Sequence, residues 1–580
     1  MGTEFSRDDL LPPVLPDWRG VLAEGVAAGR AITRSHTAFH RFRDVASQHE
    51  WAMRRRAEGR GRTIINIGMP DWALTKAALA EIWDRFEEAG LPPPDAYQLI
   101  LERRMGLPAE LREGAPQETG PALWTEDDWM DLGRTVPIQP QAPLIGSPAS
   151  FENTLCGLAA GLDTIGNFAN FVNRYPYWDD EVGQIASVLR ALGAMSAHRE
   201  TGVVADSYLE DGHSGVFADF RSIVGWAMFE RRLVEGLCGA AYAPAFGGLT
   251  SDPFLHAAVF LALESTGPAD GVIDGYYHGD TVGHVESMDR NLALFVNDAT
   301  VSLAADAQFG WGAAYLPTPL TERERVPGTS DILEVHRLTR AIEPHAREMA
   351  ARIDWSETEA LGADIAEGAN TWLGRLDDYL ATNGIDLADP LELMLATRRM
   401  GAVAIERIGL GTEAEFAHPT ELTQMSLEAR EREIARVSQS SAARLDGIGV
   451  AVASTDVHHF AKLVIEGVLE ERGARIVDGG LAVDPEALLD RALEADCAAV
   501  VATTHNGWAL NFGDRLAAAR GRRGAGITLV MGGVLNEDAG KGSNAELPRD
   551  VTPDLNARGI VTTNDLLELV TVLAETAPRA

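Results

Sequence analysis

Three turns rich in polar residues and glycine follow apolar, strand-like runs near the carboxyl end of the chain. They are Thr455, Asp456, Val457, His458 and His459 after the first run, Thr503, Thr504, His505 and Gly507 after the second, and Gly532, Gly533, Val534 and Leu535 after the third. An imidazole with a carboxylate two residues earlier has the ingredients of a metal ligand whose second ring nitrogen is held by an acceptor. One histidine cannot enclose a metal, so His458 would serve where a macrocycle fills the other positions.

The elements that must position these residues alternate between strand and helix from about residue 446 onward. This alternation predicts a doubly wound parallel sheet of about five strands, in which ligands bind beyond the carboxyl ends of the strands. The paired glycines of the third turn would let a bulky ligand approach the backbone closely. On the residues alone, an ordinary flavodoxin-like domain with a turn histidine remains an alternative.

The three turns, in this order, resemble the signature of cobalamin-binding domains, which reads aspartate-x-histidine-x-x-glycine, serine-x-leucine and glycine-glycine. The resemblance implies that His458 is the lower axial ligand of cobalt and that Asp456 orients it. It also implies a slot for the displaced nucleotide tail, lined by Thr503, His505, Gly507, Gly532 and Gly533. Two positions depart from the pattern, since Ala461 replaces the glycine and His505 replaces the leucine. His459 lies one place beyond the motif and is expected to begin a helix.

The rest of the chain predicts a larger unit in front of this domain. Residues 61–412 alternate short apolar runs with amphipathic helix-length stretches, which favours an α/β fold of the TIM-type (β/α)8 barrel class. Residues 1–60 read as a helical extension and residues 413–446 as a polar linker, which leaves 447–580 for the flavodoxin-like (Rossmann-like) domain.

Several stretches of the predicted barrel resemble the catalytic subunit of glutamate mutase, among them GMPDWALTKAALAEIWDRF, LEDGHSGVFADF and GGLTSDP. The resemblance implies that Glu210 contacts the amino group of the substrate, with His213 in the adjoining loop. Two arginines that grip the dicarboxylic substrate in that family correspond to Asp71 and Leu99. We therefore expect a substrate other than glutamate, one that places a hydroxyl or a cation opposite Asp71.

Together the two resemblances imply an adenosylcobalamin-dependent radical mutase, an isomerase acting on a small molecule. Three alternatives stay open. A corrinoid methyltransferase would need a helical-bundle cap where residues 413–446 hold about one helix, and a non-enzymatic cobalamin carrier would need a partner-binding module. A pyridoxal phosphate aminomutase would need a reactive lysine, and Lys76, Lys462 and Lys541 all lack an apolar setting at a strand end.

Bulk properties narrow the partners and the compartment. The net charge of -36 argues against nucleic-acid binding, which needs a clustered cationic surface. No apolar run approaches the length of about 18 residues that a membrane span needs. Cys156, Cys238 and Cys497 show neither metal-ligand nor disulfide spacing, so we expect a reducing, cytoplasmic setting. A homodimer is the default assembly. Residues 277–284, with two histidines and an aspartate, are expected to line the barrel mouth rather than bind a metal.

Overall fold

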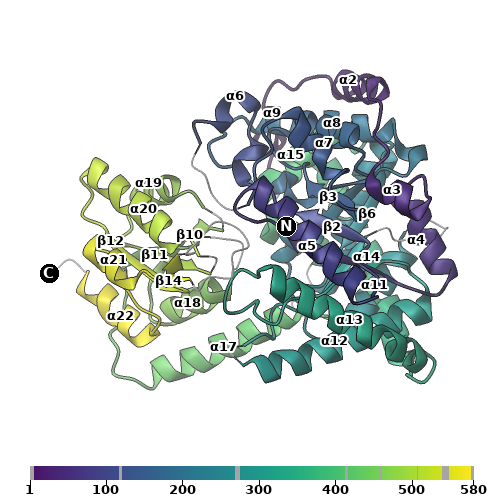
Figure 1. Cartoon of the computed structure of the whole chain (residues 1–580). Helices are drawn as coiled ribbons and strands as arrows, with labels where there is room; N and C mark the ends of the chain where they lie inside the picture. Colours follow the sequence, from purple (N-terminus) through teal and green to yellow (C-terminus); the bar gives the residue numbers. More distant parts are fainter. Residues whose placement is uncertain are drawn as a thin grey trace. The chain divides into compact units, whose positions relative to one another are not determined.

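The structure of the chain is a computed structural model. It describes residues 5–115, 120–267, 275–285, 287–411, 416–455, 460–481, 483–505, 507–537 and 548–576. Over these ranges the chain divides into two compact units, residues 5–418 and residues 419–576. Figure 1 follows the first unit from purple into green and the second from green into yellow. No helix in the described ranges is long and apolar enough to cross a membrane.

Eight parallel strands form the centre of the first unit. They are β1 (Arg62–Ile67), β2 (Ala96–Leu99), β3 (Gln139–Pro143), β4 (Thr164–Gly166), β5 (Val204–Tyr208), β6 (Ala241–Ala245), β7 (Tyr276–His278) and β8 (Ala314–Leu316). The strand order is β6-β5-β4-β3-β2-β1-β8-β7, and a parallel bridge between Phe246 and Tyr277 joins its two ends. The predicted TIM-type barrel is therefore confirmed.

Helices surround this barrel and bury the outward faces of its strands. Those that follow successive strands are α5 (Trp72–Glu88), α6 (Ala109–Arg112), α7 (Glu126–Leu132), α8 (Ser150–Ala160), α9 (Glu181–Ser196), α10 (Phe220–Arg231), α11 (Pro253–Ser265), α12 (Met288–Phe309) and α13 (Thr329–Ala350). Helices α14 (Ser356–Thr382), α15 (Pro390–Met400) and α16 (Ala402–Leu410) add a further layer. In β1, Ile65 and Ile67 pack outward against helices, whereas Ile64 joins the small core inside the barrel. This alternation follows from the two-residue period of a strand.

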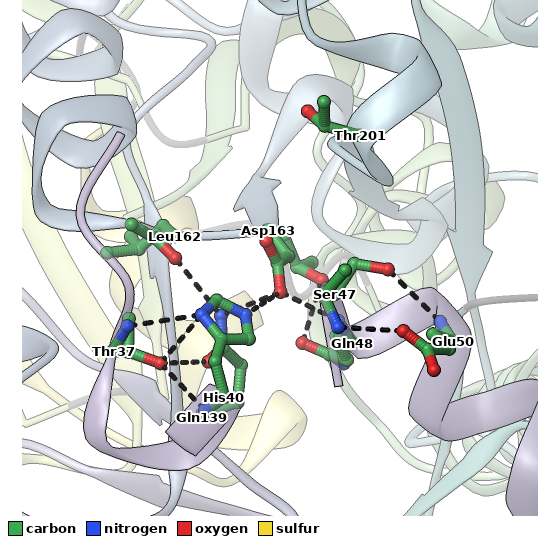
Figure 2. Close-up of polar contacts among 12 residues, drawn as sticks. Thr37, His40, Ser47, Gln48, Glu50, Gln139, Leu162, Asp163 and Thr201 are labelled. Carbon is green, nitrogen blue, oxygen red and sulfur yellow. Dashed lines mark hydrogen bonds and ion pairs between the residues drawn. The ribbon is translucent and has the colours of Figure 1, made fainter. Parts of the chain in front are cut away.

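The amino-terminal extension forms four helices, α1 (Arg7–Leu10), α2 (Trp18–Ala31), α3 (Ala38–Arg43) and α4 (Gln48–Ala57). Figure 2 shows the polar network that ties α3 and α4 to the amino-terminal end of the barrel. Its centre is Asp163, which is fully buried just before β4. One Asp163 oxygen lies 2.7 Å from Nε2 of His40 and accepts hydrogen bonds from the Gln48 amide at 2.7 Å and from Nε2 of Gln139 at 3.1 Å. Arg34 pairs with the other oxygen.

Replacing Asp163 with asparagine is expected to destabilise the first unit by about 3 kcal/mol. The variant keeps the size of the side chain but leaves the half-buried Arg34 without its counter-charge, and it places an amide donor opposite groups that are themselves donors. The measurement is the urea midpoint of tryptophan fluorescence. Asp84→Asn, at an exposed position of α5, is the matched control. Equal midpoints for the two variants would contradict the structural role of Asp163.

The second unit is built on a five-stranded parallel sheet. Its strands are β9 (Gly449–Ser454), β10 (Arg475–Gly480), β11 (Ala499–Thr504), β12 (Thr528–Gly533) and β15 (Val561–Thr562), in the order β10-β9-β11-β12-β15. A separate antiparallel pair joins β13 (Asn536–Glu537) to β14 (Arg549–Asp550). The strand order reverses next to β9, as in doubly wound folds, so the prediction of this fold class is also confirmed.

Helices cover both faces of this sheet. One face carries α17 (Glu421–Ser438), α18 (Phe460–Glu471) and α22 (Leu566–Glu575), and the other carries α19 (Pro485–Glu494), α20 (Ala509–Arg523) and α21 (Thr552–Ala557). In β9, the side chains of Val450 and Val452 pack on the face covered by α17, α18 and α22, while those of Ala451 and Ala453 pack on the opposite face. Helix α17 lies in the segment predicted as a linker and packs within the second unit.

Candidate functional site

The turns predicted to bind a ligand meet at the carboxyl edge of the second sheet. Strands β11 and β12 are in register there, with Thr503 opposite Gly532 and Thr504 opposite Gly533. The Val534 amide donates to the carbonyl of Thr504 at 2.8 Å, so the two turns are joined through their backbones. The Thr455 amide donates to the carbonyl of Thr503 at 2.8 Å and ties the end of β9 to the same edge.

Glycine is required at two positions of this edge. A β-carbon on Gly532 would lie 2.5 Å from the carbonyl oxygen of Thr563, closer than any real contact. Gly533 has a φ of +94°, in the left-handed region, and a β-carbon there would collide with the carbonyl of Thr504. No side chain can therefore project from these two positions, because the backbone of Thr563 and of Thr504 occupies that space.

A buried hydroxyl at the same edge lacks a partner. Thr503 and Thr504 are both 3% exposed, and Oγ1 of Thr504 has no hydrogen-bond partner in the described ranges. Gly507 follows with a φ of +74°, while His505 is exposed at the rim. Val534 and Leu535 are half-buried beside them. An unpartnered hydroxyl next to two bare glycines suits the polar tail of a bulky ligand.

The predicted cobalt ligand falls in a segment between two described elements. Asp456, Val457, His458 and His459 lie outside the described residues. On one side Ser454 ends β9, and on the other Phe460 is the first described residue of α18. The role of His458 therefore stays a prediction from the sequence.

One contributor to this edge was missed by the sequence reasoning. The Gly533 amide donates to Oδ1 of Asn564 at 2.5 Å, and Nδ2 of Asn564 donates back to the carbonyl of Gly533 at 3.1 Å. Asn564 thus fixes the glycine turn from the far side of β12. The available signal was its position directly after β15, at the edge where the other turns gather.

In the barrel, Glu210 follows β5 and anchors a neighbouring loop. Its buried carboxylate accepts hydrogen bonds from the amides of Gly247, Gly248 and Leu249 at 2.8, 2.9 and 3.1 Å. The Tyr208 side chain also hydrogen-bonds to it. Burial raises the pKa of Glu210 above the usual carboxyl range, and these donors oppose the shift. The glutamate is therefore at the mouth of the barrel, where its contacts hold the loop after β6.

The other two candidate catalytic residues have different surroundings. His213 is buried, with Nε2 3.1 Å from the carbonyl of Thr397 and the ring edge-on to Trp226, and burial lowers its pKa to about 4. Asp71 is exposed and caps helix α5, where it accepts from the Leu74 amide at 2.8 Å. Within the described ranges, the hydrogen bonds of Glu210, His213 and Asp71 share no partner.

Residues 277–284 lie at the end of β7. Asp280 accepts from the amides of Val282 at 2.7 Å and Gly283 at 3.0 Å, and burial raises its pKa to about 6. His284 is buried, and neither ring nitrogen has a hydrogen-bond partner in the part of the chain that the structure covers. Within the same ranges, no three His, Cys, Asp or Glu side chains are placed to hold a metal ion.

Comparison with known proteins bears on the second unit. Residues 447–542 match the family model described as the B12 binding domain. A solved structure, a cobalamin-binding protein from Desulfitobacterium hafniense DCB-2, is similar at 18% identity over 37% of this chain and 95% of that chain, with a TM-score of 0.21. No curated protein matches the chain. The family match over residues 447–542 places a B12-binding domain in the second, five-stranded unit of this chain.

Proposed function

We propose that this chain is an adenosylcobalamin-dependent isomerase of the radical mutase class. The observation that carries the proposal is the combination, in one chain, of a TIM-type barrel with a domain that matches the B12-binding family. Barrels of this class bind small substrates at the carboxyl ends of their strands. The second unit would hold the cofactor and the barrel would hold the substrate.

The residues at the edge of the second sheet fit a cobalamin. The bare backbone at Gly532 and Gly533 and the unpartnered hydroxyl of Thr504 would receive the nucleotide tail, with Thr503 and Gly507 beside them. His505, at the rim of the same edge, replaces the leucine of the family signature and would meet the tail with a polar ring.

The segment between β9 and α18 would supply the ligand to cobalt. His458 would bind the metal, and Asp456 would hold its second ring nitrogen, which would fix the tautomer. Bound adenosylcobalamin supplies a cleavable cobalt–carbon bond, and with it the ability to abstract a hydrogen atom from an unactivated carbon. The barrel contributes position and shelter from water, since most inward side chains of its strands are apolar or uncharged.

The lysines support cobalamin alone over an aminomutase that also uses pyridoxal phosphate. Lys76 pairs with Asp131 at 2.7 Å, and Lys462 pairs with Glu466 at 2.7 Å and Asp478 at 2.9 Å. The two carboxylates raise the pKa of Lys462, although burial opposes the shift, so its amine is held in the charged form. A Schiff base needs the neutral amine. Lys541 lies outside the described residues.

The helical content before the second sheet supports a mutase over a methyltransferase. In the described part of residues 413–446 there is one helix, α17 (Glu421–Ser438), and it packs on α18 and α22 of the same unit. The helical-bundle cap that usually precedes a corrinoid domain in methyltransferases would need several helices there.

The test is a visible-spectrum titration of the whole chain with adenosylcobalamin and, separately, with methylcobalamin. We expect adenosylcobalamin to bind more tightly and to change to the base-off form, because a protein histidine replaces the nucleotide base. Tighter binding of methylcobalamin would favour methyl transfer instead. Failure of both to bind would contradict the proposal, because the edge of the second sheet would then not be a cobalamin site.

A further inference from the structure

A single carboxylate stands inside the barrel. Among the residues of its eight strands, all of which are described, Asp206 is the one Asp or Glu and Arg62 is the one Lys or Arg. The neighbours of Asp206 in β5 face outward, since Ala205 joins the outer core and Ser207 donates to Glu230 of α10 at 2.6 Å. Asp206 therefore faces inward, because side chains alternate along a strand.

Among the described residues, one oxygen of this carboxyl group lacks the partner that a buried polar atom needs. Asp206 is 3% exposed, and its Oδ1 has no hydrogen-bond partner within the described ranges. Arg62 does not neutralise it, because Arg62 begins β1 at the amino-terminal end of the barrel, where its Nε donates to the carbonyl of Gly312 at 3.0 Å. A buried carboxyl without a partner is costly and calls for a specific reason.

Further unsatisfied oxygens face the same interior. Asn66 and Gln98 are adjacent in the register of β1 and β2, and Oδ1 of Asn66 and Oε1 of Gln98 both lack partners among the described residues. Gln98 is 9% exposed, and its side chain hydrogen-bonds to Tyr276 of β7 on the other side of β1 and β8. The interior thus presents three acceptor oxygens that lack a donor.

Aromatic rings complete the surroundings of Asp206. Tyr208, two residues further along β5, stacks on Tyr276 with ring centroids 6.1 Å apart and an angle of 18° between the planes. Both rings belong to the inward face, since Tyr276 is part of the inner core and Tyr208 packs against it. The faces of such rings attract cations.

We infer that the barrel interior binds the ammonium group of a small substrate, held by Asp206, with the oxygens of Asn66 and Gln98 as further acceptors. The inference rests on the proposed function for its claim that the ligand is the substrate, whereas the binding itself requires no cobalamin. It also distinguishes Asp206 from Glu210, whose carboxylate already accepts from three backbone amides.

The charge state of Asp206 gives the binding a pH signature. Burial, with the nearby carboxylates of Asp211 and Glu230, raises its pKa to about 8. The empty barrel therefore keeps a proton on Asp206 at neutral pH, and an ammonium group competes with that proton. Affinity for an amine that stays protonated over this range should rise as the pH increases from about 6 to about 8.

The experiment is calorimetry of the whole, cobalamin-free chain with propylammonium and its neutral isostere 1-propanol. We expect propylammonium to bind, 1-propanol not to bind, and Asp206→Asn to bind propylammonium about 30-fold more weakly. Asp84→Asn, the exposed control on α5, should bind as the parent does. Asp206→Asn should also keep the melting temperature at neutral pH, because the protonated carboxyl group and the amide are both uncharged there, whereas replacing a purely structural aspartate would lower it.

Three results would overturn the inference: no binding of propylammonium, equal binding of 1-propanol, or unchanged affinity in Asp206→Asn. If Asp206→Asn does not fold, Gln98→Leu provides the second variant, with a smaller expected loss of affinity because a neutral acceptor is removed. Cobalamin titration of the same protein separates the two proposals. If cobalamin binds but the amine does not, only the proposed ammonium site is contradicted. If the amine binds but cobalamin does not, only the proposed mutase function is contradicted.

Discussion

Replacing His458 with alanine is expected to abolish the histidine-ligated spectrum of bound cobalamin and to lower turnover by more than about 100-fold. Loss of a residue that only supports a metal ligand typically reduces affinity or activity by about 10- to 100-fold, so loss of the ligand itself should exceed that range. The measurement is electron paramagnetic resonance of the cobalt(II) form, in which a coordinated nitrogen splits the signal. The parent should show that splitting from a protein nitrogen when the imidazole is labelled with 15N, and the variant should not.

His459 provides the matched control for this prediction. It is the same residue type, one position further along, and it falls outside the aspartate-x-histidine spacing of the family signature. His459→Ala should keep the nitrogen splitting and most of the turnover. If His459→Ala loses the splitting and His458→Ala keeps it, the cobalt ligand is His459. If both variants keep the splitting, neither histidine binds cobalt.

The second unit could be predicted from the sequence nearly element by element. Its strands are covered on both faces, so they appear as continuous apolar runs such as GVAVAS and AVVATT, with turn residues directly after them. Because all five strands are parallel, the turns had to meet at one edge. The pair of hydrogen bonds between Asn564 and Gly533 could not be predicted, since it depends on the register in which β15 pairs with β12.

The barrel could be predicted as a fold but not as a site. Asp71 illustrates the difference, because an aspartate directly before an amphipathic helix is typical of an N-cap, and that local role is the one the structure shows. The contacts of Glu210 join residues almost forty positions apart and depend on the loop after β6. The sequence does show Asp206 as a lone carboxylate in an apolar strand. Whether its side chain points into or out of the barrel, however, depends on the strand register.

The anchoring contacts of Glu210 predict a large effect from a small change. In Glu210→Gln, the amide oxygen can accept from two of the three backbone amides, while its NH2 group faces the third. One buried N–H is left unsatisfied, at a cost of about 1–3 kcal/mol. We expect hydrogen exchange at Leu249 to accelerate and kcat/KM to fall by about 100-fold, because the loop forms part of the barrel mouth.

Glu406→Gln separates a role at the barrel mouth from a loss of stability alone. Glu406, in α16, is also buried and accepts from backbone amides, those of Ala218 at 2.8 Å and Asp219 at 3.1 Å. Both variants should lower the melting temperature to a similar extent, but only Glu210→Gln should lose kcat/KM beyond what its stability explains. The way in which the loss divides between kcat and KM distinguishes two roles for Glu210. A rise in KM with little change in kcat would mean that Glu210 contacts the substrate, as the resemblance to glutamate mutase implies, whereas a fall in kcat with faster exchange in the loop would mean that it acts by holding residues 247–249 in place.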